Sequence, residues 1–316
     1  MPLARNVPAD HGLSVRMFFT GLLLVVLYGG FIAVLWAIGL SFAFIVVVAA
    51  VLLFGQYWFS DKLALWSMHG RLVTPEQAPE LHGIVDRLCA LADMPKPKVA
   101  IADTDMPNAF ATGRSPKAAV VCATSGLLRR LNEAEVEAVL AHEISHVAHR
   151  DVAVMTIAST LGVVAGLTTR MMFYAGLFGG FGGGGRGGGN NNNSGGQIVL
   201  MEMAIMLVSI VVYAISFLLT RALSRYRELA ADRSGAILIG RPSVLAAALV
   251  KVTGEMSRIP TRDLRKAEAF NAFFFTPALT QGRMGISIST LFSTHPTLER
   301  RLAQLSELEA HLGQTA

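Results

Sequence analysis

The segment H-E-I-S-H, from His142 to His146, carries the residue types of this sequence that are best suited to chemistry. Residues four apart lie on one face of a helix, so both imidazoles can reach the same ion, and two such nitrogens suit zinc. Glu143 is displaced by about 100° around the helix axis, which keeps it off the metal but lets it touch a water molecule beside the ion. The pattern predicts amide hydrolysis assisted by one Zn²⁺ per chain, with Glu143 as general base.

A catalytic zinc site usually has three protein ligands, and the sequence offers three candidates for the third. His149 shares the helical face but lies about 10.5 Å along the axis from His142, so it can join only if the helix breaks. Asp151 is the second candidate. The third lies in E-L-A-A-D, where Glu228 and Asp232 are four apart, so one can bind metal while the other accepts an imidazole N–H. Taken alone, this segment fits a solvated helix with intrahelical ion pairs better.

The helix that carries H-E-I-S-H has a clear start. Asn132 can cap it, and Glu135, three positions on, can reach back to close a capping box. Leu131 and Val136 fit the hydrophobic staple that accompanies such a box. A five-residue pattern also recurs by chance, and the capped helix in an apolar context makes a chance match rarer.

Short β-like runs precede this helix, and they are K-V-A-I-A from Lys98, A-F-A-T from Ala109 and A-A-V-V-C-A-T from Ala118. We expect them to form a small antiparallel sheet. Helices are expected after Thr74 and again over most of the chain after Arg221. The predicted fold class is α+β and mainly α-helical, with a small antiparallel sheet joined to membrane helices.

The composition points to a membrane, because 53% hydrophobic and 16% charged residues are too apolar a mixture for a soluble chain of 316 residues. Residues 17–60 contain no charged side chain and would span about 66 Å as one helix, roughly twice a bilayer core. They therefore predict two spans, roughly 17–37 and 41–59. A second pair is expected at 152–178 and 198–220, which gives four transmembrane helices. A cleaved signal peptide is the alternative for the first span, but its apolar core is too long.

These spans divide the chain into alternating parts. The expected parts are a cytoplasmic N-terminus (1–16), a first transmembrane hairpin (17–60), a cytoplasmic catalytic part with the metal-binding helix (61–151), a second hairpin (152–220) and a second catalytic part with the third ligand (221–316). Within the second hairpin, the Gly- and Asn-rich stretch 179–197 is expected to be a flexible linker outside the cytoplasm.

Basic residues flank the spans mainly on one side, which predicts that both termini and the site are cytoplasmic. They are Arg5, Arg16, Lys62, Arg71, Arg150, Arg221, Arg225 and Arg227, against Arg186 and Arg170 elsewhere. The net charge of +5 then follows from topology, and no nucleic-acid partner is expected. Cys89 and Cys122 are expected to be reduced core residues.

Four motifs in this order resemble the HtpX-type membrane zinc metalloproteases, which are relatives of the CAAX-prenyl endopeptidases. They are P-N-A-F-A-T-G from Pro107, H-E-I-S-H, E-L-A-A-D and S-T-H-P-T-L-E-R-R from Ser293. The resemblance covers nearly the whole chain and implies a gluzincin-like site with His142, His146 and Glu228 on zinc and Glu143 as base. The long Gly and Asn tract departs from the family pattern and leaves the function of that loop open.

The resemblance also implies roles for other residues. Asn108, Ala109, Phe110 and Ala111 resemble a strand edge along which substrate backbone lies. His295 and Arg301 resemble the pair that orders the site and stabilises the oxyanion, and Asp151 and Asp232 would support the ligands. Without the resemblance, His295 could simply end a loop and Arg301 could be an exposed helix residue.

The function that the resemblance implies is quality control in a bacterial inner membrane, by an endopeptidase that cuts misfolded or damaged membrane proteins. Its partners would be protein substrates, the lipid bilayer and other membrane proteases. Two alternatives stay open at this point. A prenyl-protein processing protease would need a larger helical chamber than four spans readily supply. A non-catalytic zinc-binding scaffold or sensor would not need Glu143.

Overall fold

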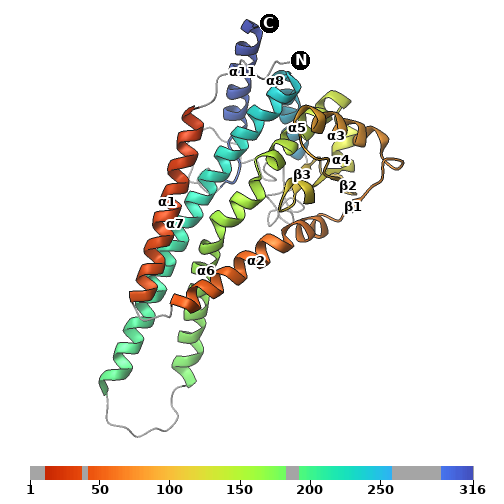
Figure 1. Cartoon of the computed structure of the whole chain (residues 1–316). Coiled ribbons are helices and arrows are strands. Elements are labelled where there is room, and N and C mark those ends of the chain that lie inside the picture. The colour runs from red at the N-terminus through yellow and green to blue at the C-terminus, as the bar shows by residue number, and fades with distance from the viewer. Residues whose placement is uncertain (1–10, 38–41, 183–191, 258–292, 316) are drawn as a thin grey trace. The chain divides into compact units, whose positions relative to one another are not determined.

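The computed structural model describes residues 11–37, 42–182, 192–257 and 293–315 (Figure 1). In chain order the elements are α1 (His11–Ala37), α2 (Phe42–Ser67), β1 (Gly70–Leu72), α3 (Pro79–Leu91), β2 (Lys98–Ala102), β3 (Ala109–Thr112), the 3-10 turn η2 (Pro116–Ala118), β4 (Val120–Thr124), α4 (Ser125–Arg130), α5 (Glu133–Ala148), α6 (Asp151–Gly182), α7 (Asn192–Ile239), α8 (Pro242–Ser257) and α11 (Leu298–Thr315). The expected class, mainly helical with a small sheet, is confirmed.

The sheet of the described residues has four strands in the order β1-β2-β4-β3 and is mixed, so the antiparallel sheet expected from the sequence is wrong. β2 and β4 are parallel, whereas β1 pairs with β2, and β3 with β4, in the antiparallel sense. The cause is that β4 doubles back from β3 and enters between β3 and β2. β4 is buried along its whole length, as a strand with neighbours on both sides should be. β1 was not expected, because three residues are too few to show an alternating pattern.

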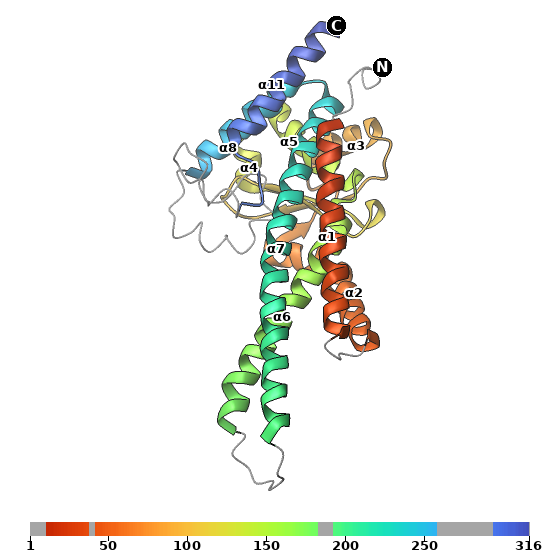
Figure 2. The ribbon, with the colours of Figure 1, turned by 90° about the vertical axis from the view of Figure 1, so that its left-hand side faces the viewer.

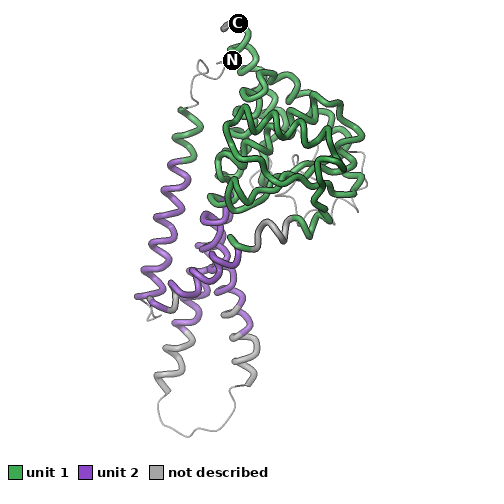
Figure 3. The backbone as a smooth tube through the Cα atoms, turned by 45° about the vertical axis from the view of Figure 1, so that its right-hand side comes forward, with its two compact units in different colours: residues 1–17, 57–154, 221–316 green, residues 18–56, 155–220 purple. Residues whose placement is uncertain are grey.

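The chain divides into two compact units (Figure 3). Unit 1 comprises residues 1–17, 57–154 and 221–316, and unit 2 comprises 18–56 and 155–220. In unit 1 the sheet and helices α3, α5 and α8 share one core, in which Leu88, Val139 and Leu249 are fully buried. α11 packs against α8 (Figure 2). Cys89 and Cys122 are free and buried in this core, as expected.

Unit 2 carries the apolar helices. Among the described residues, three helical stretches are long and apolar enough to cross a membrane, namely His11–Ala37, Asp151–Arg170 and Leu200–Ile239. Large apolar side chains on them face outward, including Phe18 at 66% and Leu207 at 63% exposure. The four expected spans are not confirmed, because the described apolar part of α2, Val46–Trp58, covers only about 20 Å of a core about 30 Å thick.

Polar contacts join the helices inside unit 2. The hydroxyl of Tyr28 on α1 donates to the carbonyl of Ala158 on α6 at 2.5 Å and lies 2.5 Å from the hydroxyl of Ser216 on α7. Gly162 on α6 lacks a side chain where Ser216 approaches, since a Cβ there would lie 2.5 Å from its hydroxyl oxygen. Small residues and shared hydroxyl contacts are the usual means of packing helices in a bilayer.

The expected linker at 179–197 is shorter in the structure, because α6 continues to Gly182 and α7 already begins at Asn192. Residues 183–191, the centre of that predicted linker, lie outside the described residues. α7 continues from the apolar stretch through Glu228 to Ile239 without a break, so one helix joins a membrane span to the E-L-A-A-D motif.

Candidate metal centre

Helix α5 positions the H-E-I-S-H motif, and the capping box expected at its start is present. The side chain of Asn132 accepts from the backbone of Glu135, and the Glu135 side chain accepts from the backbone of Asn132, both at 2.9 Å. These bonds satisfy donors at the helix start that would otherwise lack partners. The helix then packs its apolar face into the core of unit 1, and His142 and Glu143 are buried with it.

Helix α5 does not run directly into α6, which begins the third expected span. It ends at Ala148, and α6 begins at Asp151 after Arg150 adopts a left-handed backbone with φ 56°. This break turns Asp151 back toward the motif, where its Oδ2 lies 2.6 Å from Nδ1 of His146. His149 is the C-cap residue that follows α5, and its Nε2 lies 3.4 Å from Oγ of Ser234. Its ring is therefore not the third member of the metal-binding group.

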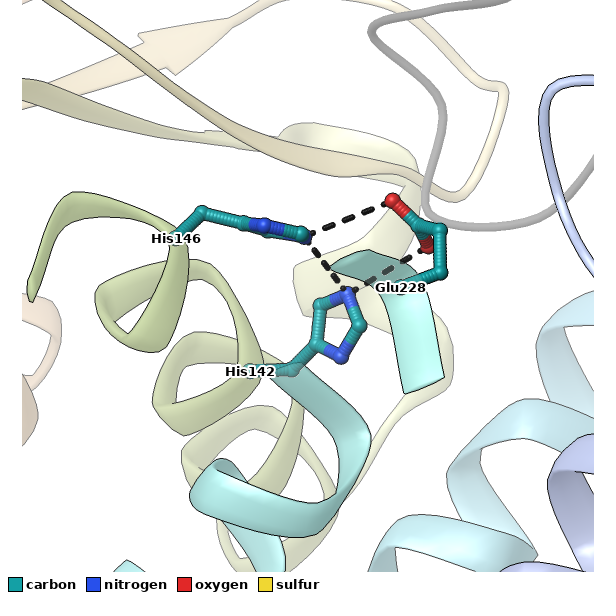
Figure 4. A group of neighbouring side chains, drawn as sticks. All are labelled: His142, His146 and Glu228. Atoms are coloured by element: carbon teal, nitrogen blue, oxygen red, sulfur yellow. Dashed lines mark hydrogen bonds and ion pairs between the residues drawn. The ribbon is translucent and has the colours of Figure 1, made fainter. Parts of the chain in front are cut away.

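Nitrogen and oxygen atoms of His142, His146 and Glu228 converge on one point, and they all lie within 4.8 Å of one another (Figure 4). The two Nε2 atoms are 3.1 Å apart. Oε1 of Glu228 lies 3.4 Å from Nε2 of His146, and Oε2 lies 3.7 Å from Nε2 of His142. Of the candidates for third ligand, Glu228 is therefore the one that the fold brings to the histidine pair.

These residues fit a metal ion because of what holds the far side of each ring. Nδ1 of His142 lies 2.9 Å from Asp232, and Nδ1 of His146 lies 2.6 Å from Asp151. A carboxylate at that distance accepts the Nδ1 proton, so in the neutral rings both Nε2 lone pairs point toward the same place. Two lone pairs facing each other at 3.1 Å repel unless a cation or a proton lies between them. The donor set of two imidazoles and one carboxylate suits zinc.

Burial and neighbouring charges together set the protonation of the ligands in the metal-free chain. Burial lowers the pKa of His142, against the raising effect of Asp232, which keeps the ring neutral and able to bind metal. Burial opposes ionisation of Glu228, but the nearby rings of His295 and His146 hold its pKa well below the ordinary value of 4.5. Glu228 is therefore an ionised acceptor, as a metal ligand must be.

Glu143 lies beside the ligands on α5 and faces the edge of the sheet. Its Oε2 accepts a hydrogen bond from the backbone N–H of Ala111 at 2.9 Å. Burial raises the pKa of Glu143 to about 8, although His146 and Arg301 act in the opposite direction. A carboxyl group with such a pKa can accept and return a proton near neutral pH.

Strand β3 contains three of the residues that were predicted to bind substrate backbone, and the fourth, Asn108, immediately precedes it. β3 pairs only with β4 in the described part of the chain, so its other edge has no partner strand there. Asn108 pairs with Thr124, and alternation along an antiparallel ladder turns the N–H groups of Ala109 and Ala111 to the outer edge. Ala111 is half-buried, whereas Asn108, Ala109 and Phe110 are buried.

The segment from Ser293 brings His295 to Glu228 and Arg301 to Asp232. Nδ1 of His295 lies 3.0 Å from Oε2 of Glu228. Arg301, in the first turn of α11, binds both oxygens of Asp232 at 2.6 Å and is 1% exposed. The carbonyl of Ser293 accepts from Arg225 on α7 at 3.0 Å, which fixes this segment to the helix that carries Glu228.

Two residues of the site were not identified as such from the sequence. Gly235 on α7 faces α5 so closely that a Cβ would lie 2.8 Å from the backbone nitrogen of His142. A glycine inside a helix, seven residues after Glu228, was a signal for close approach. Arg227 was counted among the basic residues that flank the spans, but it is buried and forms an ion pair with Asp151. Nothing in the sequence pattern marked that pairing.

A small cavity with a volume of about 10 Å³, room for about one water molecule, lies beside His146. It is lined by the end of β3 and the break between α5 and α6, including Ala111, Gly113, Val147 and Val152. Gly113 has φ 127°, and a Cβ there would lie 2.6 Å from Ala119, so only glycine fits this turn. The lining mixes apolar residues with polar and charged ones, among them His146, Arg150 and Asp151.

Comparison with known proteins gives a consistent result. The family model described as Peptidase family M48 matches residues 75–309. A protein of Streptomyces coelicolor named Protease HtpX homolog 1 is 56% identical over 97% of this chain and 96% of its own length. Protease HtpX homolog of Moorella thermoacetica is 54% identical over 98% and 99%. The crystal structure of S. mikatae Ste24p has a similar fold, with a TM-score of 0.55 and 20% identity over 93% of this chain and 66% of that one.

Proposed function

The chain belongs to peptidase family M48, and from this premise we propose that it cleaves misfolded or damaged membrane proteins with the help of one zinc ion. It is a membrane metalloprotease, since its relatives are named as proteases and its described part includes helices apolar enough to cross a bilayer. The observation that carries the proposal is the convergence of His142, His146 and Glu228 beside the carboxyl group of Glu143.

His142, His146 and Glu228 would hold the zinc ion, which when bound would supply Lewis acidity toward a carbonyl oxygen and a water molecule. Asp232 and Asp151 keep the two rings in the tautomer that presents Nε2. Because the rings and both aspartates are largely buried, bulk water is excluded and the electrostatic interactions inside the site are strengthened.

Glu143 would move the protons of the reaction. Its Oε2 is engaged by Ala111, which leaves Oε1 to take a proton from the attacking water molecule. The protonated carboxyl would then give that proton to the amine nitrogen that leaves the cleaved bond. Burial raises the pKa of Glu143 to about 8 in the metal-free chain, which favours the protonated form that the second step needs. A bound cation beside the carboxyl group would favour the ionised form that the first step needs.

His295 and Arg301 would have different parts in this chemistry. His295 adjoins Glu228 and can place a ring N–H toward the negative oxygen that develops at the cleaved carbonyl. Arg301 donates Nε–H and Nη2–H to the two oxygens of Asp232, so its contribution would be to order the support of His142 rather than to touch substrate.

Substrate would lie as an extra strand along the outer edge of β3. Main-chain bonds to the N–H and C=O groups of Ala109 and to the C=O group of Ala111 would bind many sequences alike, because they read no side chain. The N–H of Ala111 is already donated to Glu143. Backbone binding that reads no side chain suits an endopeptidase with broad substrates.

The site would work at the cytoplasmic face of a bacterial inner membrane. α6 begins at Asp151 and enters an apolar stretch, and Glu228 follows the apolar part of α7 by a few residues. The basic residues that flank these stretches favour the cytoplasmic side. An Arg186→Cys variant, with Cys89 and Cys122 buried, should react with an impermeant thiol reagent outside cells. Labelling that needs a broken membrane would contradict this orientation.

The direct test of function is cleavage of an unfolded membrane protein by the purified chain, with and without a chelator. We expect zinc-dependent cleavage and expect Glu143→Gln to keep its zinc yet lose at least about 100-fold in rate, since general-base catalysis is worth 10² to 10⁴. The rate is measured by gel densitometry and zinc by metal analysis of the same preparation. Full cleavage by Glu143→Gln would remove the general-base role. A wild type that binds zinc but cuts nothing would instead favour a scaffold or sensor.

A further inference from the structure

Behind each histidine of the metal centre lies the same series of side chains, a carboxylate and then an arginine. Behind the ring of His142 lies a carboxylate, Asp232, and behind that carboxylate lies an arginine, Arg301. Behind the ring of His146 the order is repeated with Asp151 and Arg227. Both histidines lie on α5, but the carboxylate and the arginine come from α7 and α11 in the first series and from α6 and α7 in the second, so their likeness does not come from a sequence repeat.

The first series is fully enclosed. Arg301 from α11 donates Nε–H and Nη2–H to the two oxygens of Asp232, each at 2.6 Å, and the two side chains are 2% and 0% exposed. A guanidinium that binds both oxygens fixes the plane of a carboxylate as well as its charge. Asp232 in turn meets Nδ1 of His142 at 2.9 Å, so the ring is held from its far side.

The second series is nearly as enclosed. Arg227 on α7 forms an ion pair with Oδ1 of Asp151, and the two side chains are 7% and 9% exposed. The other oxygen, Oδ2, contacts Nδ1 of His146 at 2.6 Å. Adjacent residues on a helix point about 100° apart, so α7 presents Glu228 to the metal site and Arg227 to the carboxylate behind it.

Each arginine supplies the ionic partner that a buried carboxylate of the site requires. A buried carboxylate without a partner is strongly disfavoured, and one that already faces an imidazole needs a further donor to stay ionised and in place. Asp151 also sits directly after the left-handed Arg150, at the start of α6, where its position depends on the turn as well as on its contacts. In the described part of the chain, Arg227 is the cation that forms an ion pair with Asp151.

We propose that Arg227 is a positioning residue of the metal centre, which holds Asp151 and through it the ring of His146, as Arg301 does for His142 through Asp232. The inference rests on the proposed metalloprotease function. It assigns to Arg227 a role that neither its place beside a membrane span nor its neighbour Glu228 indicates. Arg227 touches neither metal nor substrate in this role, so its effect must pass through Asp151.

The test measures binding of Co²⁺ to the purified full chain, by competition with a chelator and by the visible absorption of the bound ion. Arg227→Gln should weaken Co²⁺ binding by about 10- to 100-fold and change the absorption bands, because loss of such outer contacts typically costs that much. Arg227→Lys, which keeps a charge beside Asp151, should recover part of the affinity and the wild-type bands. Arg300→Gln, at an exposed neighbour of Arg301, is the matched control and should bind as the wild type does.

A double-mutant cycle with Asp151→Asn tests the route of the effect. If Arg227 acts through Asp151, adding Arg227→Gln to Asp151→Asn should change the affinity by less than about twofold, since the two changes remove one interaction. A further loss of tenfold or more in the double variant would overturn the proposal, as would wild-type affinity in Arg227→Gln. Should the single variant fail to fold by circular dichroism, the comparison of the double variant with Asp151→Asn still decides.

Failure of this inference and failure of the proposed function give different results. If the wild type binds no Co²⁺ and Glu228→Ala has nothing to lose, the metal site itself is wrong. If the wild type binds one ion, Glu228→Ala loses it and both Arg227 variants bind normally, only the positioning role is wrong.

Discussion

At the scale of single residues, the surroundings of Glu143 change the pKa of its carboxyl group. Its carboxyl group is buried between the sheet edge and the ligands, and burial raises its pKa from the ordinary 4.5 to about 8 in the metal-free chain. The same burial that suits a general base therefore makes the ionised form costly when no metal is bound. Enzymes commonly accept such a cost at the residues that act on protons.

This cost predicts a pH dependence of stability. The folded metal-free chain keeps a proton on Glu143 that the unfolded chain releases, so stability is full below about pH 4.5 and falls as pH rises to about 8. Glu143→Gln cannot ionise and escapes the loss, which amounts to at most roughly 5 kcal/mol. Thermal unfolding of chelator-treated protein in detergent should show the variant's advantage growing from pH 4.5 to 8 and constant above. An advantage that does not change with pH would show that Glu143 is not a buried acid.

At this scale the sequence revealed the residues whose partners are local. The capping box of Asn132 and Glu135 and the shared face of His142 and His146 follow from helix geometry alone, and the structure contains both. Arg227 and Gly235 were missed as parts of the site because their partners lie on other elements. The sequence pattern of α7 does not indicate which residues of α5 or α6 will face that helix.

At the scale of elements, the site depends on how closely α7 approaches α5. Gly235 allows this contact, since a Cβ would come within 2.8 to 3.0 Å of backbone atoms of Ala141 and His142. Backbone atoms in a capped helix cannot give way as a flexible side chain would. The same approach brings Glu228 and Asp232, earlier on α7, to the two sides of the His142 ring.

Gly235→Ala should therefore push α7 away from the motif. We expect a loss of about 1 to 3 kcal/mol in unfolding free energy from overpacking, together with weaker zinc binding. Gly254→Ala is a matched control, because Gly254 also lies inside a helix, α8, and a Cβ there meets nothing within 4 Å. The control should keep its zinc and gain up to about 1 kcal/mol. Equal zinc affinity in both variants would contradict the prediction, because it would show that the close contact at Gly235 does not affect the metal site.

The elements also show where sequence patterns fall short. The three β-like runs are strands, but their pairing is set by the path of the chain, which inserts β4 between β2 and β3. The break at Arg150 could not be foreseen either, because arginine has no local preference for a left-handed backbone. That break decides whether Asp151 faces His146 or points along a continued helix.

At the scale of the whole molecule, unit 1 is discontinuous in sequence. Its segments 57–154 and 221–316 supply the histidine pair and Glu228, and the chain between them belongs to unit 2. The metal site therefore depends on residues that the apolar parts of α6 and α7 separate in sequence. Membership of the family and membrane character could be predicted from the sequence, because motifs and hydropathy depend only on residues that are close together in it. The number of spans could not be established in the same way.

The most direct test of the central claim is X-ray absorption at the zinc edge, with metal analysis, on the wild type and on Glu228→Ala. The wild type should hold one zinc ion per chain with two imidazole nitrogens at about 2.0 to 2.1 Å and a carboxylate oxygen at a similar distance. Glu228→Ala should lose that oxygen and most of its zinc after mild chelation. Zinc content and coordination that are the same in both proteins would contradict the claim that Glu228 joins His142 and His146 around one ion.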